Sequence, residues 1–429
     1  MGWKTVMKQQ KLVEKMTIEE KAAILSGKTV WQTREIDRLS IPSIFLSDGP
    51  HGIRKQAGAG DHLGLNASLN ATCFPTAATI ANSWNQDLGE EIGQALGEEA
   101  ASMDVNILLG PGLNIKRSPL CGRNFEYFSE DPYLTGTCAA AAVRGIGKTG
   151  AAATIKHFAC NNQEKGRTTA DSVVSQRALR EIYLKGFEMA VKEGKARSLM
   201  TSYNPLNGHW TASNYDLCTT VLRGEWGYEG IVMTDWWAKM NDPVEGGKGD
   251  MKNTAAMVRA QNDLYMVVGN GGSEENIYED NTLEALESGN LSVGELQRCA
   301  MNICRFILES PVAKRPLKTP EELEKEAGSF AFVPVKLIPE KEETMRLSIE
   351  HTGRYKFFVK LRSGLSQQAQ SSCNLLLNGK PVATVQTNGT GNEWNLIKLE
   401  NIYLEPGDYQ AALQDVKAGM EIAWVEVCR

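Results

Sequence analysis

The sequence predicts an α/β protein, a TIM-like (β/α)8 barrel followed by a small all-β sandwich domain. Three observations support this prediction. Short apolar runs alternate with helical stretches over about 270 residues, which is typical of parallel strands joined by helices. Polar residues follow several of these runs, where parallel strands of a barrel would end. Beyond Pro311 the pattern changes to short alternating strands separated by turns.

The barrel region is predicted to begin with a helix at residues 10–28, because Thr17 and Glu20 form a capping-box pattern before an apolar stretch. The runs that we interpret as strands are 43–48, 77–81, 105–109, 152–155, 198–200, 231–233 and 263–268. The helices expected between them are 86–102, 131–147, 176–193, 214–226, 250–261, 280–288 and 292–309.

Polar side chains come directly after the predicted strands. The carboxyl ends of parallel barrel strands lie on one face, so we expect these residues to gather there. They are Asp48, Lys156, His157, Tyr203 and Asp235. An open dinucleotide-binding sheet would instead need a GxGxxG turn after its first strand, and none follows residues 43–46.

The stretch from Gly230 to Trp237 places a carboxylate and two indoles after a buried strand. One interpretation is an active-site carboxylate beside flat apolar surfaces that suit a sugar ring. The other is an aspartate that caps the next helix, with two tryptophans in the core. This stretch alone favours neither interpretation.

The domain limits follow from changes in composition. We expect the barrel at residues 1–312, a charged and proline-containing linker at 313–330, and the β-sandwich at 331–429. Turn signals such as Asn378-Gly379 separate the short strands of the last region.

The composition argues against several classes of partner. The 46 basic and 52 acidic residues leave a net charge of −6, with no basic block that would attract nucleic acid or an anionic membrane. The nine cysteines form no CxxC pair or metal-ligand pattern, so we expect reduced thiols, no metal and no cofactor. Neither a membrane span nor a signal-peptide core is present, so we expect a cytoplasmic location.

Five motifs, in order, resemble those of the catalytic barrel of glycoside hydrolase family 3. They are SDGPHGIR at 47–54, CGRNFEYFSEDP at 121–132, KHFACNNQEKGR at 156–167, TSYN at 201–204 and MTDW at 233–236. The similarity covers about residues 10 to 310 and looks strongest to the family's bacterial β-glucosidases. The resemblance implies an enzyme that removes a terminal sugar with retention from a β-linked glucoside or short oligosaccharide.

The resemblance also implies roles for individual residues. Asp235 matches the nucleophile, and Asp48 matches the carboxylate that accepts hydrogen bonds from distal sugar hydroxyls. The other residues expected around the sugar are Arg123, Lys156, His157, Arg167, Tyr203 and Trp236, the last as a wall of the subsite. We expect the neighbouring cations to lower the pKa of Asp235 and so keep it ionised. Glu126, Glu130 and Glu164 are expected to support other side chains.

The acid/base catalyst is not identifiable in the sequence. A retaining glycosidase needs a second carboxyl group about 5 to 5.5 Å from its nucleophile. The family usually carries it on a separate α/β sandwich domain, and we identify no such segment after residue 312. One branch uses a histidine in the loop after the Lys156-His157 strand, but residues 164–173 hold none. We therefore expect an absent domain, a partner chain or another subunit of a homo-oligomer to supply it.

Two functions remain open from the sequence. The first is a retaining exo-β-glycosidase, and the second is a non-catalytic sugar-binding or scaffold protein derived from the same barrel. We favour the enzyme, because binding alone does not need a complete nucleophile set. Residues 331–429 weakly resemble carbohydrate-binding modules, and a generic sandwich explains them equally well.

Overall fold

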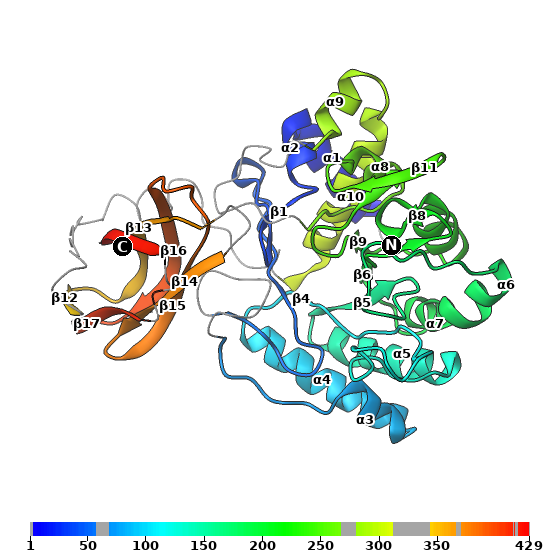
Figure 1. Ribbon diagram of the computed structural model, residues 1–429, viewed down its shortest axis with the longest axis horizontal. Coiled ribbons are helices and arrows are strands. Elements are labelled where there is room, and N and C mark those ends of the chain that lie inside the picture. Colours follow the sequence, from blue (N-terminus) through cyan, green and yellow to red (C-terminus); the bar gives the residue numbers. More distant parts are fainter. Residues whose placement is uncertain are drawn as a thin grey trace. The chain divides into compact units, whose positions relative to one another are not determined.

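The computed structural model describes residues 3–56, 68–266, 280–311 and 344–428, apart from 366–369, 415, 417 and 418. The chain divides into two compact units, which can be followed by colour in Figure 1. Unit 1 comprises Met1–Arg54 and Ala71–Pro316, and unit 2 comprises Lys55–Asn70 and Leu317–Arg429. The predicted linker at 313–330 lies outside the described residues, so the domain limits expected from composition stay a prediction.

A curled sheet of five parallel strands forms the centre of unit 1. Its order is β3-β4-β5-β6-β9, and the bounds are Leu46–Ser47, Ile107–Leu108, Ala152–Phe158, Ser198–Thr201 and Ile231–Met233. Every residue in these strands is buried. Burial on both faces explains why most of them appear in the sequence as continuous apolar runs rather than as alternating patterns.

The sheet separates two hydrophobic cores, because successive strand residues point to opposite faces. Met200 and Met233 belong to one core, whereas Leu199 and Val232 belong to the other. The first core also contains much of α10, and the second contains residues of α4, α5 and α7. Both faces of the central sheet are therefore covered, as in a barrel-type α/β fold.

Backbone hydrogen bonds continue from both edges of the sheet toward the N-terminal hairpin. Beside β9, Met233 forms a parallel bridge with Leu264, and Tyr265 bridges Ser26. Beside β3, Leu46 N donates to Trp31 O at 2.7 Å. The hairpin between these two contacts consists of β1, Gly27–Thr29, and β2, Gln32–Thr33. The arrangement is barrel-like, but the count of eight parallel strands stays a prediction.

The helices of unit 1 mostly follow the predicted pattern, and those expected at 86–102, 131–147 and 292–309 agree to within one residue. Among the described residues, no helix has the length and apolarity needed to cross a membrane.

The helix bounds are α1 Trp3–Lys15, α2 Ile18–Ala23, η1 Asp37–Leu39, α3 Ala77–Asn82, α4 Gln86–Ser102, α5 Pro132–Lys148, α6 Gln176–Ala178, η2 Leu179–Tyr183, α7 Lys185–Lys192, η3 Thr211–Ser213, η4 Asp216–Glu225, α8 Thr254–Arg259, α9 Thr282–Glu287 and α10 Val293–Glu309. Two hairpins also lie in unit 1, made by β7 Pro205–Leu206 with β8 His209–Trp210 and by β10 Met240–Asp242 with β11 Gly246–Asp250.

Two local predictions require correction. Residues 77–81, predicted as a strand, form helix α3, because Thr76 caps the Thr79 amide and the alanine-rich run has high helix propensity. The single helix expected at 10–28 is instead α1 followed by α2. The predicted capping box is confirmed, and it begins the second helix: Glu20 N donates to Thr17 Oγ1, and Thr17 N donates to Glu20 Oε2.

Helices α4 and α5 lie side by side in unit 1, and glycine residues allow their backbones to approach closely (Figure 1). A Cβ atom on Gly93 would lie 2.6 Å from Ala142 O, and one on Gly145 would lie 2.2 Å from Glu90 O. Neither position has room for a side chain, so a larger residue would push the helices apart. By contrast, Gly147 has no neighbouring atom within 4 Å of its Cβ position.

Unit 2 contains two antiparallel sheets whose inward side chains belong to one hydrophobic core. Phe357 and Val359 come from one sheet, and Leu375 and Val385 come from the other. The strand orders are β12-β17-β14-β15 and β16-β13-β18. The bounds are β12 Thr344–Ile349, β13 Gly353–Ser363, β14 Gln370–Leu377, β15 Lys380–Asn388, β16 Asn395–Leu404, β17 Gly407–Gln414 and β18 Met420–Cys428. These strands lie in the region where alternating runs predicted them, and the assignment as a sandwich domain stays a prediction.

Candidate functional site

The sequence-predicted residues come from the carboxyl ends of the parallel strands and the loops that follow. Asp48 directly follows β3, and Tyr203 and Asp235 each lie two residues beyond a strand. Lys156 and His157 lie within β5 rather than after it, because this strand continues to Phe158. Arg123 lies between β4 and α5, and Arg167 follows β5.

A chain of charged contacts joins three of these segments. Lys156 Nζ lies 3.1 Å from Asp48 Oδ1 and 3.1 Å from Glu126 Oε1. Arg123 Nε donates to Glu126 Oε2 at 2.7 Å. The side chains of Lys156 and Glu126 are buried, whereas 39% of the Asp48 side chain is exposed. Asp48 is therefore the carboxylate of this cluster that a ligand can reach.

The contacts set the charge states of the cluster. Asp48 is partly exposed, and the partial loss of its hydration opposes ionisation, but the Lys156 ammonium and the Arg54 guanidinium outweigh this effect and lower the pKa of Asp48 to about 2. Burial likewise opposes ionisation of Glu126, and Lys156 and Arg123 nevertheless lower its pKa. The two carboxylates in turn overcome the effect of burial on Lys156 and raise its pKa. The cluster therefore stays fully charged at neutral pH.

His157 is buried, and other residues contact both nitrogens of its ring and its backbone. Arg123 Nη2 lies 3.0 Å from His157 Nε2, and Tyr127 Oη lies 3.1 Å from Nδ1. Asn114 fixes the backbone, since its Nδ2 donates to His157 O and its Oδ1 accepts from His157 N, each at 2.9 Å. Burial lowers the pKa of His157 well below its usual value, and Arg123 and nearby cations lower it further. The imidazole is therefore neutral.

Asp235 lies close to His157 and Tyr203. Its Oδ1 accepts a hydrogen bond from Trp236 N at 2.8 Å, and its Oδ2 lies 3.9 Å from His157 Nε2. Burial and the neighbouring Asp235 carboxylate raise the pKa of Tyr203, so the phenol stays protonated. Arg167 lies over the Tyr203 ring at 4.7 Å from its centroid. The carboxylate thus has a neutral imidazole and a phenol beside it.

The expected pKa shift of Asp235 is wrong in direction. Burial raises the pKa of Asp235, and Arg123, the Trp236 amide, Arg167 and Lys156 only partly offset that effect. The cations act in the expected sense, but only 7% of Asp235 is exposed, so loss of hydration outweighs them.

The Trp236 ring lies in the hydrophobic core, as the second interpretation of this stretch anticipated. Only 3% of the residue is exposed, and its ring centroid lies 5.3 Å from that of Trp31. Trp236 Nε1 donates to Val30 O at 2.9 Å. Its ring therefore has little free surface for a sugar, and the subsite-wall role remains an untested prediction.

Sequence reasoning did not single out Arg54 and Tyr127, although both lie inside the motifs. Arg54 Nη2 lies 3.7 Å from Asp48 Oδ2, and its guanidinium lies over the Trp31 ring at 5.3 Å. The hydroxyl of Tyr127 contacts His157. The contacts of Arg54 with Trp31 and of Tyr127 with His157 join different segments, so only the position of Arg54 and Tyr127 within the motifs could have suggested a role.

Glu164 links the loop after β5 to the rest of the site. Its Oε2 accepts from Arg167 Nη1 at 2.8 Å, and its Oε1 accepts from Asn161 Nδ2 at 3.1 Å. Asn161 Nδ2 also donates to Tyr127 Oη at 3.2 Å. Glu164 and Glu126 thus both contact the side chains that surround His157 and Asp235. Across the part of the chain that the structure describes, no group of three or more acidic, histidine or cysteine side chains could hold a metal.

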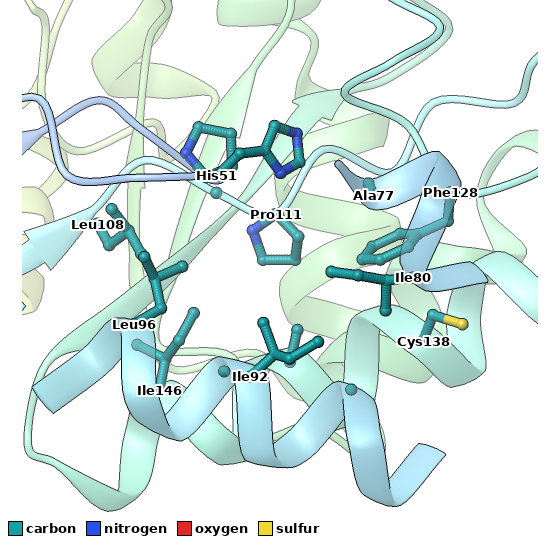
Figure 2. A pocket seen from close by; sticks show the side chains of 15 residues that line it. His51, Ala77, Ile80, Ile92, Leu96, Leu108, Pro111, Phe128, Cys138 and Ile146 are labelled. Atoms are coloured by element: carbon teal, nitrogen blue, oxygen red, sulfur yellow. The ribbon is translucent and has the colours of Figure 1, made fainter. Parts of the chain in front are cut away.

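A small apolar cavity of about 30 Å³ lies between the central sheet and helices α4 and α5. Figure 2 shows Ile92, Leu96 and Ile146 on one side of the opening and His51 on the other. The volume is close to that of one water molecule. We therefore interpret it as a packing gap and not as a ligand pocket.

The chain matches known proteins over most of its length. Residues 13–306 match the family described as Glycosyl hydrolase family 3 N terminal domain. The chain belongs to glycoside hydrolase family 3. One relative is thermostable beta-glucosidase B of Acetivibrio thermocellus, which is 47% identical over 298 residues, covering 70% of this chain and 37% of that protein.

Two solved structures of beta-glucosidases resemble this chain. A beta-glucosidase from Paenibacillus barengoltzii has 48% sequence identity and a TM-score of 0.69, covering 98% of this chain and 47% of that one. Beta-glucosidase 3B from Thermotoga neapolitana, in complex with alpha-D-glucose, has 36% identity and a TM-score of 0.63, covering 79% of this chain and 49% of that one. The chain thus spans less than half the length of each of these three proteins.

Proposed function

We propose that this chain is the barrel of a retaining, exo-acting β-glycosidase that removes a terminal sugar from a β-linked glucoside or short oligosaccharide. The main support is the Asp235 carboxylate, held at a strand end beside His157 and close to cations from other strand ends. The names of the relatives and the glucose complex of the Thermotoga enzyme agree with this substrate class.

In this mechanism, Asp235 Oδ2 attacks the anomeric carbon and the bond to the leaving oxygen breaks. The electron pair departs with that oxygen, which takes a proton from the acid catalyst. The same catalyst, now a base, takes a proton from water as the water oxygen attacks the same carbon and the bond to Asp235 breaks, so two inversions give net retention. The Trp236 amide orients the carboxylate through Oδ1. Asp48 would accept two hydrogen bonds from neighbouring sugar hydroxyls, while Arg123, Lys156, His157, Arg167 and Tyr203 would surround the ring.

We propose that the acid/base comes from a segment outside these 429 residues, from a partner chain or from another subunit of a homo-oligomer. The chain spans only 37% of its Acetivibrio relative, which leaves room for such a segment in that protein. Protonation of the leaving group contributes about 10² to 10⁴-fold to the rate. The barrel alone should therefore retain measurable activity on substrates whose leaving group needs no proton.

The test is release of p-nitrophenol from its β-glucoside by the wild-type chain and by Asp235→Asn. Asp87→Asn, a change of the same kind at an exposed position of α4, is the matched control. We expect activity in the wild type and the control, and none in Asp235→Asn. A fluorinated glucoside should also form a covalent adduct on Asp235 that mass spectrometry detects. Glucose binding without any adduct would instead favour a non-catalytic sugar-binding protein.

We also propose that residues 1–312 complete a (β/α)8 barrel and that residues 331–429 form a separate β-sandwich. The shared core of the two antiparallel sheets supports the second domain. If the proposed linker at 313–330 joins the two domains, limited proteolysis should cut first within it and leave two resistant fragments. Early cleavage within β13 would contradict this division.

A further inference from the structure

We propose that Tyr127 is a positioning residue that keeps His157 in the tautomer with its hydrogen on Nδ1. Nε2 then faces the Asp235 carboxylate as a hydrogen-bond acceptor. Only the catalytic consequence of this tautomer depends on the proposed function, because the tautomer itself can be measured without turnover.

The contact at Nε2 identifies the nitrogen that carries the hydrogen. Arg123 Nη2 lies 3.0 Å from His157 Nε2, and a guanidinium group can only donate. Nε2 must therefore accept this hydrogen bond. Glu126 holds the same guanidinium at 2.7 Å, which keeps the donor in place. A neutral imidazole that accepts at Nε2 carries its hydrogen on Nδ1.

The hydrogen on Nδ1 needs an acceptor, because an unpaired hydrogen-bond donor in a buried site is destabilising. Tyr127 Oη lies 3.1 Å away, and Tyr127 is only 1% exposed. A phenol can donate or accept, so its other contacts matter. Asn161 Nδ2 donates to the same oxygen at 3.2 Å, and Glu164 keeps this amide group turned toward the site. The phenol oxygen is thus arranged as an acceptor.

The surroundings of His157 favour a neutral ring. The charged or titratable groups that act on it are Arg123, Lys156, Arg167, Tyr127 and Asp235. Three of these are cations, and burial adds to their effect in lowering the pKa of His157. Because the ring does not carry both hydrogens, the tautomer decides whether the nitrogen that faces Asp235, Nε2, carries a hydrogen or a lone pair.

The tautomer matters for the nucleophile, since Nε2 lies 3.9 Å from Asp235 Oδ2. With a lone pair on Nε2, the imidazole donates no hydrogen bond to Oδ2, and this oxygen keeps its electron pair for attack. The opposite tautomer would direct an N–H group at Oδ2 and stabilise the carboxylate before the reaction, which would slow the attack.

Nuclear magnetic resonance of the full chain with nitrogen-labelled histidine tests the proposal. The chain has five histidines, and His157→Asn assigns the relevant ring. We expect the wild type to show a protonated Nδ1 and an unprotonated Nε2. Tyr127→Phe should shift the Nε2 resonance toward the protonated position. Tyr133→Phe, at an exposed tyrosine, is the matched control and should leave it unchanged.

A wild-type His157 ring protonated on Nε2 would overturn the proposal. So would a folded Tyr127→Phe variant whose His157 Nε2 resonance is the same as that of the wild type. If that variant does not fold, the wild-type spectrum still decides the tautomer. Asn161→Ala then tests the role of the Tyr127 phenol. Without the Asn161 donor, Tyr127 can donate its own hydrogen to His157 Nδ1, and the Nε2 resonance should shift toward the protonated position. The expected spectra without any covalent adduct on Asp235 would support the tautomer and refute the proposed catalytic function.

Discussion

Replacement of Lys156 by methionine measures how strongly the buried charge cluster stabilises unit 1. Lys156 Nζ lies 3.1 Å from a carboxylate oxygen of both Asp48 and Glu126, and only 4% of its side chain is exposed. At that distance each pair contributes about 5 kcal/mol at an effective dielectric constant of about 20, before the several kcal/mol that desolvation of the ammonium costs. Lys156→Met leaves two adjacent carboxylates without this cation. We expect the free energy of unfolding to fall by about 3 to 5 kcal/mol.

Lys148→Met is the matched control, because Lys148 forms an ion pair of similar length at the surface. Its Nζ lies 2.7 Å from Glu90 Oε1, but 52% of its side chain is exposed. We expect this change to cost at most about 1 kcal/mol. Urea denaturation of the full chain, followed by tryptophan fluorescence, gives both values. Equal losses in the two variants would refute the argument that burial decides the effect.

The difference between the wild type and Lys156→Met should also depend on pH. The depressed pKa of Asp48 contributes stability that is present above its unfolded-state value of about 3.9 and is lost as the pH falls through about 2. The variant lacks most of this contribution at every pH. The difference should therefore be largest near neutral pH and shrink below about pH 4. A constant difference down to pH 2 would contradict the assigned charge states.

The remaining predictions concern helix packing and the nucleophile. Gly93→Ala should lower the free energy of unfolding by about 1 to 3 kcal/mol, because its Cβ would meet Ala142 O, whereas Gly147→Ala should raise it by about 0.5 to 1 kcal/mol. Urea denaturation checks both, and a stabilised Gly93→Ala would contradict the packing of α4 on α5. The rate of adduct formation on Asp235 should fall with decreasing pH, with its midpoint above the usual aspartate value of 3.8, since burial raises this pKa. A midpoint below 3.8 would show that the cations outweigh burial.

Much of the fold was predictable because its signals are local. The capping box at Thr17 and Glu20 depends on residues three apart, and the α10 bounds follow from apolar periodicity and a serine cap. The strands containing Lys156 and preceding Asp235 appeared as short buried runs. The strand predicted at residues 77–81 was wrong, because a short apolar run is compatible with either a strand or a helix. Only pairing within a sheet or a helix cap distinguishes the two structures.

The sequence by itself determined which chemical groups come to the carboxyl ends of the sheet, because the motifs place them in the parallel strands or in the loops that follow. Only the tertiary structure decided how these groups act on one another. The raised pKa of Asp235, the burial of Trp236 against Trp31 and the Tyr127 contact with His157 all depend on distance and hydration. Both quantities are set by segments distant in sequence, so no local pattern contains them.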